Sequence, residues 1–285
     1  MISKSIDFEK LPTQTPMYCL GNTHKVYSGF PGDYNLDVIK YGYPYEYWNK
    51  KQLYENLSAS GGCFIEIGAH IGTATLPAAD YFKWCYAIEP SSRNLSVLNY
   101  NISKNKVTNV TTEQLAFSDS PGTAKFYLFP DTNSAGHSLS NIIVGESAQS
   151  EDVRITTLDE HFSNVTNCAL LHIDTEGFDV RVLNGGKQFI RNQKTKPVIV
   201  IEFAPKMWKL GGSKIEDFIN FTKEFNYDMY SEFGEVNSPI NAAALIELNN
   251  CWKDNHRAWL DIYLVPDNLI LGESYSPTKP ILYSK

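Results

Sequence analysis

The sequence predicts an α/β fold in which a parallel sheet is covered by helices on both faces. From residue 63, short apolar runs of strand length alternate with longer amphipathic segments of helix length. Two of these runs, "CALLHI" (168–173) and "PVIVI" (197–201), are almost continuously apolar, as the central strands of a parallel sheet are. Two late extended segments, 225–231 and 258–266, have no helix pattern between them and predict an antiparallel addition at one edge of the sheet.

The other predicted elements follow in the order that this fold requires. Each strand is a short apolar run, and in most cases a helical segment follows it: strand 63–67 with helix 72–82, strand 84–90 with helix 91–104, strand 109–117, strand 168–174 with helix 177–190, and strand 196–203 with helix 213–225. Ser91 provides an N-cap for the second helix. Two further extended segments, 122–130 and 151–158, are predicted to form either a hairpin or an excursion from the sheet, with the polar loop 131–141 between them.

The length of the chain predicts one large domain with an extension. With 285 residues, of which 42% are hydrophobic, the chain can bury a full core. We expect an N-terminal extension or cap at 1–50, a main domain at 51–270 and a C-terminal tail at 271–285. The aromatic segment "YGYPYEYWNK" (41–50) is either a lid over the strand ends or a cap packed on the sheet edge.

Composition and charge argue against several classes of partner. The net charge is −7 and no long basic run occurs, which disfavours a nucleic-acid partner. No apolar run approaches the roughly 20 residues that span a bilayer, and the first residues lack the apolar segment of a signal peptide. Five cysteines without metal-ligand spacing are expected to be free thiols. The sequence therefore predicts a cytoplasmic location.

The segment "CFIEIGAHIGT" (63–73) predicts a ligand site at the end of the first strand. The strand reaches Glu66 and turns through Gly68 and Gly72, and ligands of doubly wound sheets bind at such strand ends. The middle glycine of the dinucleotide fingerprint is missing, since His70 and Ile71 occupy this part of the turn, and a Gly-Lys-Ser/Thr phosphate loop is absent. This combination favours S-adenosylmethionine, a ligand without phosphate that carries a positive amino group.

Glu89 supports an adenosine ligand. It closes the second strand, 23 residues after Glu66, where a carboxylate can accept hydrogen bonds from both ribose hydroxyls. NAD would use the same acid. Glu89 therefore indicates a ligand that contains adenosine, and the glycine spacing decides between NAD and S-adenosylmethionine. An ordinary β–α turn with two surface carboxylates is the alternative.

Six blocks of the chain resemble the FkbM-type S-adenosylmethionine-dependent methyltransferases in their order and approximate spacing. They are "FIEIGAHIGTATL", "YAIEPSSRNLSVLNYN", "LAFSDSPGTAKFYL", "ITTLDEHF", "LLHIDTEGFDVRVLNGG" and "PVIVIEF". The resemblance covers about residues 50–265, and the block that contains "DTEGFD" is its most specific part. It implies the class I methyltransferase (Rossmann-like) fold, a doubly wound seven-stranded sheet of order 3-2-1-4-5-7-6 with strand 7 antiparallel. It also implies O-methylation of hydroxyls, in sugars and polyketide-like compounds.

Carried over by position, the resemblance also implies the cofactor site. The methionine part would be lined by the turn after the first strand, the ribose held by Glu89, and the adenine flanked by the end of the third strand. The predicted cofactor residues are Glu66, Gly68, His70, Gly72, Thr73, Glu89, Pro90, Ala116, Phe117 and Asp174. The chain departs from the family pattern twice: His70 stands in place of Asn, which alters a cofactor contact, and His172 replaces a Lys, so that no role of that lysine is carried over.

Methyl transfer to a hydroxyl predicts a general base. A positioned base contributes about 10²–10⁴-fold, and the predicted catalytic residues are Asp174, Glu176, His172 and His137. Asp174 has the best position, at the carboxyl end of a central strand. His172 either pairs with Asp174, two residues further on the same face of the strand, or is a core histidine. His137 either faces the substrate or is solvated.

Three further alternatives stay open. Asp174 and Glu176, together with Glu202 at the end of the next strand, are hard oxygen ligands that would suit Mg²⁺. The predicted acceptor is a hydroxyl of a sugar or glycan, with a lipid, polyketide or peptide as the alternative. A NAD-dependent oxidoreductase and a non-catalytic cofactor-binding module are the alternatives from other functional classes.

Overall fold

We describe the fold from a computed structural model of the chain. The structure describes residues 18–19, 25–30, 32–40, 47–130, 133–145, 148–231, 240–255, 258–267 and 269. The predicted C-terminal tail (271–285) and residues 41–46 of the aromatic segment lie outside the described residues. Helix α2 (Tyr47–Ser58) crosses the predicted boundary at residue 50, and the division into an extension and a main domain stays a prediction.

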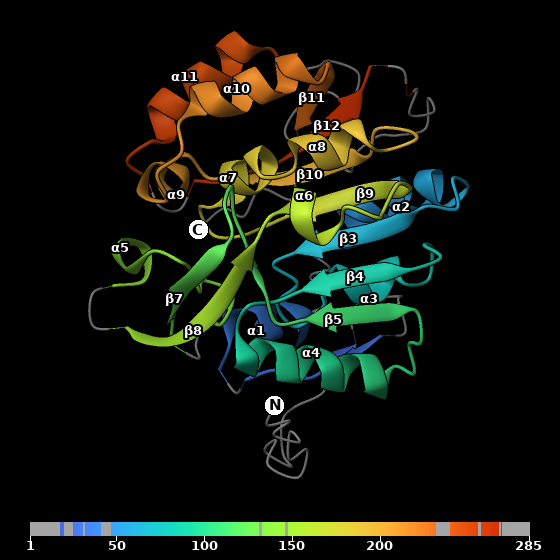
Figure 1. Cartoon of the computed structure of the whole chain (residues 1–285). Helices are drawn as coiled ribbons and strands as arrows, with labels where there is room; N and C mark the ends of the chain where they lie inside the picture. The colour runs from blue at the N-terminus through green and yellow to red at the C-terminus, as the bar shows by residue number, and fades with distance from the viewer. Residues whose placement is uncertain are drawn as a thin grey trace.

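A seven-stranded sheet forms the centre of the molecule, and it confirms the predicted α/β class (Figure 1). Its order is β5-β4-β3-β9-β10-β12-β11, which corresponds to 3-2-1-4-5-7-6 when these seven strands are counted along the chain. Only β12 runs against its neighbours, since it is antiparallel to both β10 and β11. The bounds are β3 (Cys63–Ile67), β4 (Cys85–Ile88), β5 (Val110–Glu113), β9 (Cys168–Ile173), β10 (Val198–Phe203), β11 (Tyr227–Ser231) and β12 (Leu260–Pro266).

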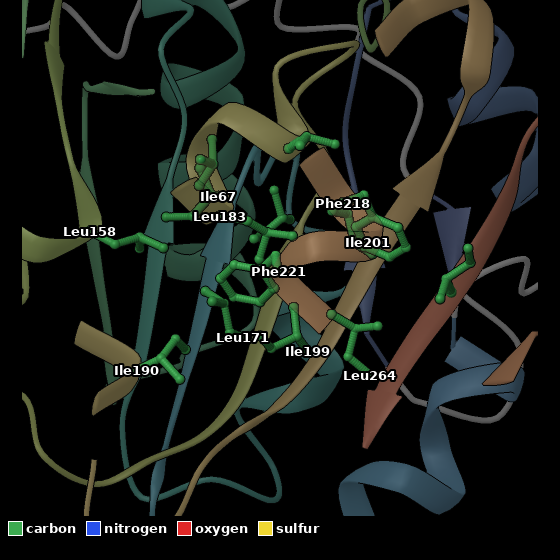
Figure 2. Close-up of a cluster of buried hydrophobic side chains, with 14 of the residues drawn as sticks. Ile67, Leu158, Leu171, Leu183, Ile190, Ile199, Ile201, Phe218, Phe221 and Leu264 are labelled. Carbon is green, nitrogen blue, oxygen red and sulfur yellow. The ribbon is translucent and has the colours of Figure 1, made fainter. Parts of the chain in front are cut away.

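Alternating strand residues bury apolar side chains on both faces of this sheet. On one face, Ile67, Leu171 and Ile201 pack with residues of α6 (Leu158–His161), α7 (Asp179–Asn184), α8 (Lys187–Arg191) and α10 (Ile215–Glu224) (Figure 2). On the other face, Phe64 and Val200 pack with α2 and with α3 (Thr75–Ala78). Helix α4 (Ser92–Lys104) begins at the predicted cap, because the Ser91 hydroxyl accepts a hydrogen bond from the backbone N–H of Asn94.

A second, three-stranded sheet lies beyond the carboxyl ends of the main strands (Figure 1). It consists of β6 (Ala116–Phe117), β8 (Gln149–Thr156) and β7 (Gly122–Leu128), in the order β6-β8-β7. Of the two predicted alternatives for these segments, the hairpin is confirmed, since β7 and β8 are antiparallel. The predicted third strand at 109–117 is wrong in its second half: β5 ends at Glu113, and the chain then changes sheets, so that Ala116 and Phe117 pair with β8.

Two other predictions differ from the structure. Helix α11 (Ala242–Trp252) lies between β11 and β12, where no helix was predicted. Leu245, Leu248 and Trp252 lie at helical spacing on α11 and pack against the core, so the apolar stripe is present and the sequence reading missed it. The helix predicted at 72–82 is reduced to the single turn of α3. Within the described part of the chain, no helix combines the length and the apolar character that crossing a membrane requires.

Candidate functional site

The turn after β3 brings the ends of β3 and β9 into close contact. Gly68 has φ +94°, and a Cβ there would lie 1.7 Å from the carbonyl oxygen of Asp174, so only glycine fits. Gly72 has φ +95°, and a Cβ there would lie 2.7 Å from Cδ1 of Leu98 on α4. The two predicted glycines are therefore required by backbone conformation and by close packing.

His70 occupies the left-handed region of this turn, with φ +48°. Histidine and asparagine are both enriched in that conformation, so His70 preserves the backbone shape at the position where an Asn was expected. Its backbone N–H donates to Oε2 of Glu89 at 2.8 Å, and its Nε2 lies 2.6 Å from Oγ of Ser134. His70 thus links the turn after β3, the end of β4 and the loop after β7.

Glu89 follows β4 and is 4% exposed. Besides the bond from His70, its Oε1 accepts a hydrogen bond from the backbone N–H of Ser91 at 2.8 Å. Burial raises the pKa of the Glu89 carboxyl to about 7, although these backbone donors act in the opposite direction. A group that donated further hydrogen bonds to Glu89 would favour its ionised form.

A first cavity, with a volume of about 590 Å³, opens at the ends of β3, β4 and β6. Glu89, Pro90 and Asn94 line one part of it, while its apolar walls come from Leu115, Ala116, Phe117 and Phe126. Ala116 and Phe117 therefore reach the predicted site, but from β6 rather than from a strand of the main sheet.

A second cavity, of about 1280 Å³, adjoins the first. Both are lined by Gly68, His70, Ala135, Asp174 and Glu176. The second is also lined by Glu66 and Thr73, and it extends to Lys50, Glu202, Trp259 and Asp261. Nine of the ten predicted cofactor residues thus line one of the two cavities, and Gly72 shapes the backbone behind them.

Asp174 and Glu176 lie where the two cavities meet. The backbone N–H of Asp174 donates to the carbonyl of Ile67 at 3.0 Å, which fixes the end of β9 beside the end of β3. Glu176 has φ +51°. Burial, reinforced by the nearby charge of Asp179, raises the pKa of the Glu176 carboxyl to about 8.

The comparison with protein families settles which family the chain represents. The profile of the "Methyltransferase FkbM domain" matches residues 66–229, more than half of the chain. The chain belongs to the FkbM methyltransferase family. This confirms the resemblance seen in the sequence, and the chain is therefore related to enzymes of methyl transfer.

Solved structures with a similar fold include other methyltransferases. The methyltransferase FkbM from Methylobacillus flagellatus KT is 14% identical, with a TM-score of 0.44, over 72% of this chain and 44% of that one. SMU.1697c from Streptococcus mutans, a putative methyltransferase solved in complex with SAH, is 10% identical, with a TM-score of 0.40, over 75% of this chain and 95% of that one. The chain therefore spans less than half of the Methylobacillus protein. A search of functionally curated proteins finds no match.

In this member of the FkbM family, the two predicted catalytic histidines are buried. His172 is 3% exposed, and its Nδ1 lies 3.2 Å from Oε1 of Glu66. It lies opposite Glu66 in the β3–β9 pairing. His137 is 6% exposed and lines the first cavity beside Phe126, while its Nδ1 accepts a hydrogen bond from the backbone N–H of Phe129 at 2.9 Å. His137 is therefore a wall of the cavity and not a solvated side chain.

Glu202 on β10 lines the second cavity. Burial and the neighbouring carboxylates, of which Asp174 and Glu176 act most strongly, raise its pKa well above the ordinary value. Its Oε2 is buried and has no hydrogen-bond partner among the described residues. The predicted metal alternative at Asp174, Glu176 and Glu202 is not supported: in the described ranges, no three His, Cys, Asp or Glu side chains are grouped to hold a metal ion.

Asp179 is a residue of the site that the sequence reasoning missed. It is fully buried, and its Oδ1 accepts hydrogen bonds from the backbone N–H and the hydroxyl of Thr175, at 2.7 and 2.9 Å. Its Oδ2 accepts bonds from the backbone N–H of Gly177 and from Nε1 of Trp208, each at 3.2 Å. Asp179 therefore fixes the loop that carries Glu176. Its place in the "DTEGFD" block was the available signal.

Proposed function

We propose that this FkbM-family protein is an S-adenosylmethionine-dependent O-methyltransferase that methylates a hydroxyl of a sugar or glycan. The observation that supports this most strongly is the junction of the two cavities. The first cavity is lined by Glu89 and by apolar walls, and it joins the larger second cavity at Asp174 and Glu176. The adenosine part of the methyl donor can then bind in the first cavity and its methionine part beside Glu66 and Thr73 near the junction, while the acceptor occupies the remainder of the second cavity.

The residues of the first cavity fit the proposed cofactor. Each oxygen of Glu89 takes one backbone N–H, and a carboxylate oxygen has capacity for a second donor, such as a ribose hydroxyl. Ala116 and Phe117 supply apolar contacts for an adenine. Gly68 lines both cavities without a side chain, so its backbone can border the ligand. When bound, S-adenosylmethionine supplies an activated methyl group on a positive sulfonium.

Asp174 is the general base of the proposal. It borders both cavities, so a carboxylate oxygen there can accept the proton that an acceptor hydroxyl loses as it attacks. Glu176 borders both cavities as well, and its pKa of about 8 makes it the second candidate. His172 takes no part in this step, because its ring nitrogen pairs with Glu66.

The lining of the second cavity supports an acceptor without negative charge. Five carboxylates line it: Glu66, Asp174, Glu176, Glu202 and Asp261. Lys50 is the one Lys or Arg among the described lining residues, and its Nζ lies 2.9 Å from Oδ2 of Asp261, with which it forms an ion pair. A phosphate in this cavity would be repelled by the ionised members of this set and would raise the pKa values of Glu176 and Glu202 further, which favours a neutral hydroxyl compound over a nucleic acid as the acceptor.

Two measurements test the proposed function. Isothermal titration calorimetry should show binding of S-adenosylhomocysteine, while tight binding of NAD with none of S-adenosylhomocysteine would instead support the oxidoreductase alternative. A panel of sugars and glycans incubated with labelled S-adenosylmethionine should yield a methylated product in mass spectra. Cofactor binding without methyl transfer to any hydroxyl compound would indicate a non-catalytic binding module.

A further inference from the structure

Two of the five carboxylates that line the second cavity have no counter-charge assigned to them. One of the five is paired with Lys50. Glu66 and Asp174 lie beside the positive methionine part of the proposed methyl donor. This leaves Glu176 and Glu202, neither of which takes part in an ion pair within the described part of the chain.

Glu202 also lacks a hydrogen bond at one of its oxygens. Its Oε2 is buried and has no hydrogen-bond partner among the described residues. Four other carboxylates act on it electrostatically, those of Asp174, Glu176, Asp179 and Asp261. Together with burial, they raise its pKa well above the ordinary value. In the free protein a proton therefore neutralises Glu202 at neutral pH.

The cations on this side of the protein are bound to other groups. Lys206 on α9 (Pro205–Leu210) lines a further cavity together with Glu202, but its Nζ donates to the carbonyl oxygen of Asp254 at 3.3 Å. Lys50 pairs with Asp261. These are the two cations among the described residues that line either cavity, and each has a partner other than Glu202.

Two exposed aromatic side chains line the second cavity as well. Tyr34, at the start of α1 (Tyr34–Lys40), is 67% exposed, and Trp259, directly before β12, is 38% exposed. The face of an aromatic ring attracts a cation, because the ring quadrupole places negative potential there. Carboxylates and aromatic rings at one cavity are together the groups that recognise an ammonium ion.

We propose that the acceptor carries a positively charged amino group, which binds to Glu202 while the hydroxyl to be methylated lies at Asp174. This inference rests on the proposed O-methyltransferase function, and it narrows the substrate class to amino sugars and their glycosides. The ammonium group takes the place of the proton on Glu202. The carboxyl releases that proton to the solvent, and its oxygens accept hydrogen bonds from the ammonium N–H groups.

The test uses the methyl glycosides of glucose, galactose and mannose, in which an amine replaces each hydroxyl in turn. Each amine is compared with its parent glycoside and with its neutral N-acetyl derivative. Calorimetry with protein loaded with S-adenosylhomocysteine measures binding at pH 7, where a primary amine is charged. One or more of the amines should bind about tenfold more tightly than the parent, the factor that a hydrogen bond to a charged group supplies. The N-acetyl derivative should lose this gain.

Binding of the charged amine should also release a proton, because Glu202 ionises. Titrations in buffers of different ionisation enthalpy measure this number. We expect about one proton for the amine and none for the parent glycoside. With labelled S-adenosylmethionine, the amine that binds most tightly should be methylated on an oxygen.

One variant and its control assign the effect to Glu202. Glu202→Gln keeps the size of the side chain but cannot ionise, so it should reduce the preference for the amine over the parent about fivefold or more and abolish the release of the proton. Glu247→Gln is the matched control, since Glu247 is exposed on α11 and does not line the second cavity. This control should keep both the preference and the proton release.

The possible outcomes separate the inference from the proposed function. Equal or weaker binding of every amine, compared with its parent, would overturn the inference and leave O-methylation intact; so would binding of S-adenosylhomocysteine without binding of any amine. A preference that survives Glu202→Gln, or that releases no proton, would place the ammonium group at a carboxylate that is already ionised and would also overturn it. A protein that binds no S-adenosylhomocysteine would refute the proposed function itself.

Discussion

Nδ1 of His172 lies 3.2 Å from Oε1 of Glu66, and both side chains are almost fully buried. The two residues are neighbours in the register of β3 and β9. Oε2 of Glu66 accepts a hydrogen bond from the hydroxyl of Thr75 on α3. The Glu66 carboxylate, which was predicted to contact the cofactor, is therefore bound on one side by His172 and on the other by Thr75.

This pairing predicts a structural effect for His172. The change His172→Gln should lower the free energy of unfolding by about 1–3 kcal/mol, the usual range when a buried polar group loses its partner. Turnover in the labelled methyl-transfer assay should stay within about threefold of the wild-type value. A loss of turnover as large as that of a base variant, at unchanged stability, would show that His172 acts in catalysis.

In contrast to His172→Gln, the change Asp174→Asn should reduce turnover strongly. The asparagine keeps the size of the side chain but cannot accept the proton of the hydroxyl, so kcat should fall by about 10²–10⁴-fold. The dissociation constant of S-adenosylhomocysteine, measured by calorimetry, should change less than about fivefold. If kcat is retained, the same measurement on Glu176→Gln identifies the second candidate base.

Because the pKa of the Glu89 carboxyl is raised, we expect the affinity for the cofactor to depend on pH. Its pKa of about 7 in the free protein means that the carboxyl is largely protonated below that pH, whereas ribose donors favour the ionised form. The affinity for S-adenosylhomocysteine should therefore rise between pH 6 and pH 8 and then level. Glu89→Gln should weaken binding at pH 8 and flatten this profile; an equally steep profile in the variant would assign the titration to another group, such as Glu176.

Hydrophobic periodicity was sufficient to predict the main sheet, because its central strands β9, β10 and β12 are buried on both faces. It failed where an extended chain changes partners. Residues 109–117 keep a strand-like pattern throughout, yet β5 ends at Glu113, and Ala116 belongs to another sheet. It also failed at α11, where the stripe of Leu245, Leu248 and Trp252 that packs on the core is accompanied by apolar residues on the exposed side, such as Ile246, which obscure the helical period.

The sequence predicted those residues of the candidate site that lie at the carboxyl ends of the strands. Parallel strands bring their carboxyl ends to one edge, which was sufficient to place Glu89 and Asp174 at a common site. Pairing across strands depends on register, which a sequence pattern does not specify, so the partner of His172 was beyond reach. The burial of His137 depends on how the loop after β7 folds back over the first cavity.

The close approach at Gly68 predicts intolerance of even a methyl group. In Gly68→Ala, the new Cβ would overlap the backbone of Asp174, and the residue would keep a positive φ. We expect a loss of at least about 3 kcal/mol in the free energy of unfolding, measured by denaturant titration. The control Gly122→Ala should be neutral within about 0.5 kcal/mol, since nothing lies within 4 Å of the added Cβ on β7. Equal stability of the two variants would mean that β3 and β9 end further apart than the structure shows.

Asp179 predicts a coupled loss of stability and activity. Asp179→Asn replaces one acceptor oxygen by an N–H₂ group, so that donors face donors at Thr175 or at Gly177 and Trp208. The free energy of unfolding should fall by about 2–4 kcal/mol, and kcat should fall with it, because the loop that carries Glu176 loses its anchor. The exposed Asp228→Asn on β11 is the matched control and should change neither quantity. A stable variant with wild-type kcat would show that the backbone of the loop, held by Gly177 against Met207, is sufficient to position Glu176.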